Sequence, residues 1–170
     1  MKKNLSIVIL LISLAISQSV FSQTYSFEKG KVPEGWKIDK GVLHISSEKY
    51  KSGSRSLQIK WKQNAVLTIP SPTGISEACR NRNGGMNAWN ESPTKENLLF
   101  SFRDETGKEV CQLPFLLDFK GWRCIWAKFQ GDMNMSSKSN IQSVEIQFPQ
   151  HTKKGVTYID LLEFTSKVSW

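Results

Sequence analysis

Histidine and tyrosine are the side chains with which this sequence would perform proton transfer. The two histidines, His44 and His151, lie in an alternating segment and in a turn-like segment, and neither has a Ser, Cys or carboxylate neighbour that completes a catalytic triad. The sequence contains no G-x-S-x-G, no H-E-x-x-H and no phosphate-binding glycine loop. The three tyrosines, Tyr25, Tyr50 and Tyr158, are of the kind that strands usually place in the core or at its rim. We therefore predict no catalytic residue and no organic cofactor in this chain.

Cysteine is the remaining reactive residue type, and the sequence has three: Cys79, Cys111 and Cys124. An odd number of cysteines without closely spaced pairs does not indicate a disulfide framework. One disulfide bridge plus one free thiol is compatible with an oxidising compartment. The spacing also does not match a zinc site. Because Cys111 and Cys124 sit in strand-like stretches, we expect both to be buried, inert thiols.

The amino-terminal 22 residues predict a secretory signal peptide. Lys2 and Lys3 precede an apolar run over residues 5–16, which is too short to span a bilayer, and residues 20–22 offer small side chains to signal peptidase. We place the cleavage after residue 22, so that the mature chain begins at Gln23. This pattern predicts a secreted or periplasmic protein without a membrane anchor.

The mature chain, residues 23–170, contains 170 − 22 = 148 residues, which suits one domain with its own core. The formal charge of +8 falls to +6 when Lys2 and Lys3 are removed. A basic exported domain favours anionic polysaccharide or a cell surface as its partner, and export argues against nucleic acid. The alternative is a solvated basic surface with no specific partner.

Alternating polar and apolar residues dominate the chain, which predicts an all-β domain. Residues 56–61 alternate cleanly, and about ten such strand candidates are separated by turn signals such as residues 39–41. Residues 71–84 and 131–140 read as loops, and the first of these has room for one helical turn at most. Regular short strands of this kind form an antiparallel sandwich or barrel, and we predict an antiparallel β-sandwich of jelly-roll type.

The same alternation sorts residues between the core and the outer faces. In residues 122–129, Ala127 and Phe129 share one face, whereas Trp126 and Lys128 share the other. In residues 85–90, Met86 and Ala88 suit the core and leave Asn87 and Trp89 outward. An indole stacks on a sugar ring and a cation meets sulfate or carboxylate. We therefore predict these carbohydrate-binding residues: Trp89, Trp126, Lys128, Asn87, Arg103 and Arg123. Alternatively, the tryptophans pack under a loop or against a neighbouring domain.

Three segments resemble jelly-roll carbohydrate-binding modules with the galactose-binding-like fold. They read F-E-K-G followed by V-P-E-G-W (27–36), Y-K-S-G-S-R-S-L (50–57) and Y-I-D-L-L-E-F (158–164). The resemblance implies that the first and last strands are neighbours. It also implies a structural calcium ion, held by Glu28, Asp160 and the carbonyl groups of Lys51 and Ser52, because calcium prefers oxygen ligands. The alternative is that the two carboxylates are surface charges or pair with Lys or Arg.

The second half of the chain resembles the amino-terminal domain of the chondroitin sulfate ABC lyases, of the polysaccharide lyase 8 family. The matching segments are G-G-M-N-A-W-N-E (84–91), L-D-F-K-G-W-R (117–123) and S-V-E-I-Q-F-P (143–149), and the likeness covers nearly all of residues 23–170.

The resemblance implies that β-elimination of glycosaminoglycan is carried out by catalytic domains that follow the amino-terminal domain. We expect these catalytic domains to be absent from this chain. The expected function is an accessory domain that binds or positions an anionic polysaccharide, chondroitin or dermatan sulfate, with the catalytic domain as partner. The alternatives are a purely structural domain that braces the catalytic domain, or a free-standing carbohydrate-binding module. The chain is expected to be either a fragment or a stand-alone relative.

Overall fold

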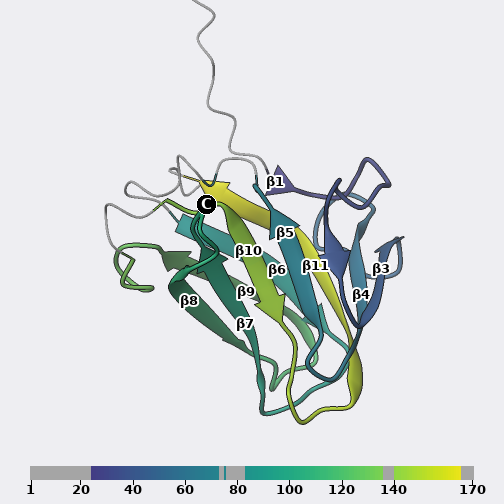
Figure 1. The fold of residues 1–170 in the computed structure, drawn as a ribbon. Coiled ribbons are helices and arrows are strands. Elements are labelled where there is room, and N and C mark those ends of the chain that lie inside the picture. Colours follow the sequence, from purple (N-terminus) through teal and green to yellow (C-terminus); the bar gives the residue numbers. More distant parts are fainter. Residues whose placement is uncertain (1–23, 73–74, 76–82, 136–139, 166–170) are drawn as a thin grey trace, which may run out of the picture.

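Two antiparallel sheets lie face to face in the computed structural model, which describes residues 24–72, 75, 83–135 and 140–165 (Figure 1). Sheet A has the order β3-β4-β11-β6-β9, with β1 paired to β11, and sheet B has the order β2-β5-β10-β7-β8. The strands of sheet A are β1 (Thr24–Tyr25), β3 (Gly41–Ser46), β4 (Ser56–Lys62), β6 (Asn83–Asn90), β9 (Gly121–Lys128) and β11 (Lys154–Thr165). The strands of sheet B are β2 (Lys37–Ile38), β5 (Val66–Pro70), β7 (Asn97–Arg103), β8 (Glu109–Leu116) and β10 (Ser143–Gln147). The predicted antiparallel β-sandwich is confirmed.

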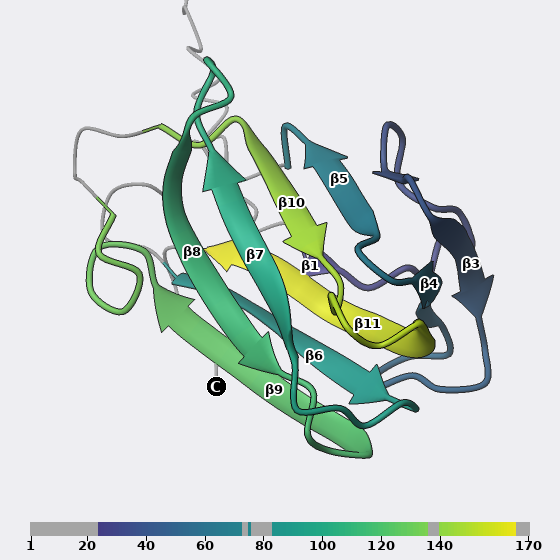
Figure 2. The ribbon, with the colours of Figure 1, turned by 60° about the horizontal axis from the view of Figure 1, so that its bottom comes forward.

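The core fills the space between the two layers, which Figure 2 shows in side view. The alternation in β4 buries Leu57, Ile59 and Trp61 and leaves the intervening side chains on the outer face of sheet A. Trp61 stacks on Phe148 with ring centroids 5.5 Å apart. Large side chains from both sheets therefore interlock, as close packing between two sheets requires.

Strand β11 forms the centre of sheet A, and it contains a β-bulge. The bulge changes which of its side chains face the core. Asp160 is paired with Asn87 but Glu163 with Gly85, so β11 carries one residue more than β6 between these pairs. The extra residue is accommodated at Leu161, whose φ angle is 52°. Beyond the bulge, β11 pairs with β1, so the first and last strands of the described structure are neighbours, as expected.

The cysteine prediction is half right. Cys111 is buried in β8, but Cys124 is exposed in β9 and not buried as expected. The reason is that Cys124 shares the outer face of sheet A with Trp122 and Trp126, whereas Ala127 lies on the inner face.

Some predictions fall outside the described residues. These are the signal peptide over residues 1–22, Cys79, and all but Ile75 of the short helical turn. Within the part of the chain that the structure describes, no helix combines the length and apolar character needed to cross a membrane.

Candidate functional site

The outer face of sheet A carries a continuous row of aromatic and polar side chains that crosses five strands. The strand register pairs His44 with Gln58, Gln58 with Tyr158, Tyr158 with Trp89, and Trp89 with Trp122. We call these five residues the central row. Its members are separated by up to 114 residues in the sequence, and only the sheet brings them together.

Hydrogen bonds fix the middle of the central row. The Gln58 Nε2 atom donates to the Tyr158 hydroxyl group at 2.6 Å, and that hydroxyl donates to Glu48 Oε2 at 2.9 Å. Burial raises the pKa of Tyr158, and the neighbouring Glu48 carboxylate raises it further, although Gln58 opposes the shift. The phenol is therefore held neutral, as a donor and acceptor at the base of the face.

The indole rings form the other half of the face. Trp89 meets Trp122 edge to face with centroids 5.9 Å apart, and its Nε1 atom donates to Glu91 Oε1 at 2.8 Å. The ammonium group of Lys49, from the loop after β3, lies 4.9 Å from the Trp89 ring centroid. All three rings on this face, including Trp126, are only half-buried.

Trp126 lies close over Gly85, its partner across β6 and β9. A methyl group at position 85 would stand 2.5 Å from the Trp126 ring, so only glycine lets the indole lie this near the backbone. Next to it, partial burial raises the pKa of the Cys124 thiol, while a hydrogen bond from Trp126 and the charge of Lys51 oppose the rise. Lys49 and Lys51 therefore both lie beside the aromatic face.

Four of the six predicted carbohydrate-binding residues share this face. Asn87, Trp89, Trp126 and Lys128 are on β6 and β9 in alternate positions, with the buried residues between them. The tryptophan orientation is as expected, because Met86 and Ala88 are buried.

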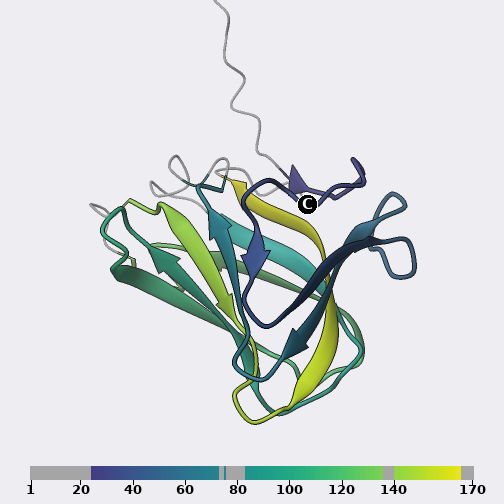
Figure 3. The ribbon, with the colours of Figure 1, turned by 45° about the vertical axis from the view of Figure 1, so that its right-hand side comes forward.

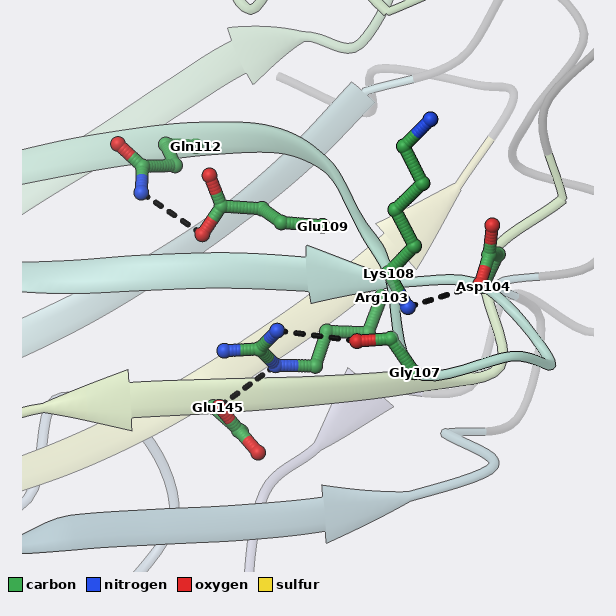
Figure 4. Close-up of polar contacts among 7 residues, drawn as sticks. All are labelled: Arg103, Asp104, Gly107, Lys108, Glu109, Gln112 and Glu145. Atoms are coloured by element: carbon green, nitrogen blue, oxygen red, sulfur yellow. Dashed lines mark hydrogen bonds and ion pairs between the residues drawn. The ribbon is translucent and has the colours of Figure 1, made fainter.

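The two arginines lie elsewhere. Arg103 is in sheet B, where its Nε atom contacts Glu145 Oε2 at 2.7 Å and its Nη1 atom donates to the Gly107 carbonyl at 3.0 Å (Figure 4). Arg123 alternates with Trp122 on β9, forms an ion pair with Asp118 at 2.8 Å and lies 4.1 Å from the Phe119 ring centroid. Neither guanidinium group joins the central row.

Sequence reasoning missed several members of the face. Trp122 lies four residues before Trp126 in the same strand, so alternation alone contained the signal for it. Gln58 and Tyr158 become recognisable only once β4 and β11 are known to pair. Lys49 comes from a loop, whose conformation carries no periodic signal.

The predicted calcium ligands meet at the connection between β3 and β4, which projects from the edge of sheet A beside the segment after β1 (Figure 3). The Glu28 Oε1 atom accepts the backbone N–H groups of Ser54 and Arg55 at 3.0 and 2.9 Å. These bonds hold the pKa of Glu28 below its usual value. Its other oxygen accepts the Ser54 hydroxyl group at 2.9 Å.

Asp160 reaches the same loop from β11. Its Oδ2 atom accepts the N–H groups of Lys51 and Ser52 at 2.8 and 3.0 Å, and its Oδ1 atom accepts that of Leu161 at 2.8 Å. Burial raises the pKa of Asp160, the backbone hydrogen bonds oppose that rise, and the charge of Glu28 adds to it. The two carboxylates are thus near enough to repel each other.

This donor set does not fit calcium well. Calcium takes about six to eight oxygen ligands, whereas the backbone N–H groups of four loop residues point at the two carboxylates: those of Lys51, Ser52, Ser54 and Arg55. The described residues contain no group of three or more His, Cys, Asp and Glu that could hold a metal ion. The calcium ion implied by the resemblance stays a prediction.

The fold is that of a two-sheet antiparallel β-sandwich domain with an aromatic outer face. The chain belongs to the family of lyase N-terminal domains, because the family model described as "Lyase, N terminal" matches residues 21–170. It is 28% identical over 154 residues to chondroitin sulfate ABC exolyase of Bacteroides thetaiotaomicron, covering 85% of this chain and 14% of that enzyme. The chain therefore spans about one seventh of the length of this curated relative.

Solved structures share the fold. An exo-beta-agarase matches with a TM-score of 0.66 at 12% identity, over 87% of this chain and 26% of that chain. A family 11 carbohydrate-binding module of Clostridium thermocellum matches with a TM-score of 0.57 at 12% identity, over 88% of this chain and 96% of that one. A xylan-binding domain of Paenibacillus barcinonensis matches with a TM-score of 0.58 at 15% identity, over 86% and 95% of the two chains. The resemblance to lyase N-terminal domains and the sandwich fold are both confirmed.

Proposed function

We propose that this chain is an accessory domain of a secreted polysaccharide lyase, and that it binds the polysaccharide on the outer face of sheet A. The central row, together with Trp126 on the same face of sheet A, is the observation that carries the proposal. Its indole rings offer surfaces on which sugar rings stack. The exposed Glu48 carboxylate can accept hydrogen bonds from sugar hydroxyl groups, and the buried Gln58 and Tyr158 side chains hold it in place from below. Family membership and the carbohydrate-binding modules among the structural neighbours support the same function.

We further propose a chondroitin-type glycosaminoglycan as the ligand. Support comes from the 28% identity to chondroitin sulfate ABC exolyase and from the net charge of +6 that remains once Lys2 and Lys3 are removed with the predicted leader. Lys49 and Lys51 stand beside the rings and add positive charge to this face of the sheet, which favours the approach of an anionic chain. In the whole protein, β-elimination would be performed by a catalytic domain outside residues 23–170, and this domain would hold the substrate near it.

Affinity electrophoresis tests the proposal. The mature chain is run in native gels with and without chondroitin sulfate, beside Trp126→Ala and beside Leu116→Ala, which removes an exposed apolar side chain from sheet B. We expect chondroitin sulfate to retard the wild type and Leu116→Ala but not Trp126→Ala. Circular dichroism checks that each variant is folded.

The opposite result has a clear meaning. If chondroitin sulfate fails to retard the wild-type chain even at low salt, the domain is a brace for the catalytic domain and binds no glycosaminoglycan. Retardation by neutral glycans alone would instead indicate a free-standing carbohydrate-binding module.

Export is part of the proposal, with residues 1–22 as a cleaved leader. The supporting observation is the short apolar run behind Lys2 and Lys3. Mass spectrometry of the protein from the native host should give a chain that begins at Gln23, and an intact amino terminus would contradict export by this route.

A further inference from the structure

A groove of about 510 Å³ opens on sheet A beyond the central row. It crosses β3, β4 and β11 and reaches the segment after β6. Its side chains are three lysines, two valines and a serine: Lys60, Lys62, Lys154, Val42, Val156 and Ser92. We call it the lysine groove.

The strand register makes the lysine groove continuous with the central row. Lys60 lies between Val42 and Val156, and Lys62 lies opposite Lys154. Val156 precedes Tyr158 by two residues on β11, so the two side chains point to the same face about 7 Å apart. A sugar chain that stacks on the central row therefore has a direct path into the groove.

Charge separates the two regions. The carboxylates of Glu48 and Glu91 lie beside the central row and accept hydrogen bonds from its Tyr158 and Trp89 side chains. These negative charges disfavour a sulfate group in that row.

The lysine groove has the opposite character. Its three lysines are exposed, and none of them forms an ion pair with any residue that the structure describes. Val42 is 58% exposed beside them, which is unusual for so large an apolar side chain on a sheet face. Cations without partners around an apolar surface suit a ligand that has both anionic groups and apolar ring faces.

We propose that the lysine groove is the subsite that recognises the sulfate or carboxylate groups of an anionic polysaccharide, while the central row stacks its sugar rings. This inference rests on the proposed carbohydrate-binding function and assigns its anion recognition to particular residues. Lysine ammonium groups act there as point charges that donate hydrogen bonds to sulfate oxygens, and the valines contact the ring faces.

The experiment compares two triple variants with the same loss of charge. The groove variant replaces Lys60, Lys62 and Lys154 by Gln. Its control replaces three exposed lysines outside the groove and the central row by Gln: Lys31, Lys37 and Lys108. Isothermal titration measures the affinity of each mature chain for chondroitin sulfate and for chemically desulfated chondroitin over a series of salt concentrations.

We expect the groove variant to bind chondroitin sulfate about tenfold more weakly, with a reduced salt dependence, and the control variant to stay near the wild type. If the two variants have equal affinity and equal salt dependence while Trp126→Ala still binds poorly, the lysine groove does not recognise the anionic groups. The proposed carbohydrate-binding function would still stand. If the wild type binds neither polymer, both this inference and the proposed function are wrong.

Discussion

At the scale of single residues, the aromatic face of sheet A depends on a glycine at position 85. Gly85 leaves the space over which the Trp126 indole lies, and a Cβ atom there would stand 2.5 Å from the ring and 2.8 Å from the Ile125 carbonyl oxygen. The backbone oxygen cannot move aside as easily as a flexible side chain. The position of Trp126, and with it one end of the aromatic face, is therefore set by residue 85.

The first prediction concerns Gly85→Ala. We expect a loss of about 1–3 kcal/mol in the free energy of unfolding, as overpacking usually causes, together with a displaced Trp126 and weaker retardation by chondroitin sulfate. Denaturation monitored by tryptophan fluorescence and affinity electrophoresis measure the two effects. Gly131→Ala is the control, since its nearest contact would be Lys128 Cβ at an ordinary 3.5 Å. Full stability and binding in Gly85→Ala would refute the steric argument.

Glu96 is a second residue with a specific structural role. Its carboxylate accepts the N–H groups of Gln150, His151 and Thr152 at 2.8–2.9 Å and the Thr152 hydroxyl group at 2.7 Å, and so holds the turn between β10 and β11. Burial raises the pKa of Glu96, but these hydrogen bonds outweigh the effect of burial and hold the pKa below its usual value. The stabilisation is thus present above the unfolded-state pKa and is lost as the pH falls through the folded-state pKa.

We therefore predict that Glu96→Gln lowers the free energy of unfolding at pH 7 by about 1 kcal/mol. The same variant should lose less stability than the wild type as the pH falls below the usual pKa of a glutamate side chain, because it no longer has this proton to bind. Urea denaturation at a series of pH values tests both statements. Glu105→Gln, an exposed turn substitution, is the control, and parallel pH profiles of wild type and Glu96→Gln would contradict the linkage.

At the scale of strands, the bulge in β11 decides which side chains reach the core. Thr157 and Ile159 are buried before it, and Leu162 and Phe164 are buried after it, so the inward positions change from odd to even numbers at Leu161. A regular strand would turn Leu162 and Phe164 outward. The bulge also places Asp160 where its carboxylate meets the loop after β3.

Deletion of Leu161 should consequently prevent folding, because the residues beyond it would be paired in the wrong orientation. Leu161→Gly keeps the extra residue and suits the φ angle of 52°, so this variant should fold. Circular dichroism and the dispersion of amide NMR signals distinguish the two. A deletion variant with native stability would show that the register of β11 is not fixed by the bulge.

The loop that joins β3 to β4 gives a prediction about metal. Since amide donors already satisfy Glu28 and Asp160, we expect calcium or EDTA to leave the melting temperature unchanged. Differential scanning fluorimetry measures it. A rise with calcium that is absent in Glu28→Gln would instead establish the calcium site that the sequence resemblance implies.

Strand faces were predictable from the sequence, but strand neighbours were not. Alternation placed Trp89 and Trp126 outward and Ala88 and Ala127 inward, because side chains in a strand point to opposite faces in turn. Sequence distance gives no comparable rule for which strands pair. The central row and the position of Arg103 in the other sheet therefore became visible only in the folded chain.

At the scale of the whole molecule, one core lies between two sheets, and its buried tryptophans come from different parts of the chain. Trp36 precedes β2, whereas Trp61 lies in β4 and stacks on Phe148, which follows β10. Such a core cannot form in one part of the chain alone. The residues after the predicted leader should thus behave as a single cooperative unit.

We predict that the mature chain unfolds in one transition, with coincident thermal curves from far-ultraviolet circular dichroism and tryptophan fluorescence. The physical reason is that loss of either sheet exposes the inner face of the other. Two separate transitions would contradict a common core.

The central position of β11 has a consequence for synthesis and transport. Residues 154–165 are made last among the described strands, yet they join the β3–β4 pair to the β6–β9 pair and give β1 its partner. On the ribosome, sheet A cannot be completed until this segment has left the exit tunnel. A nascent chain of this topology cannot complete its fold before residues 154–165 have been made, and an incompletely folded chain is the state that a translocation channel accepts.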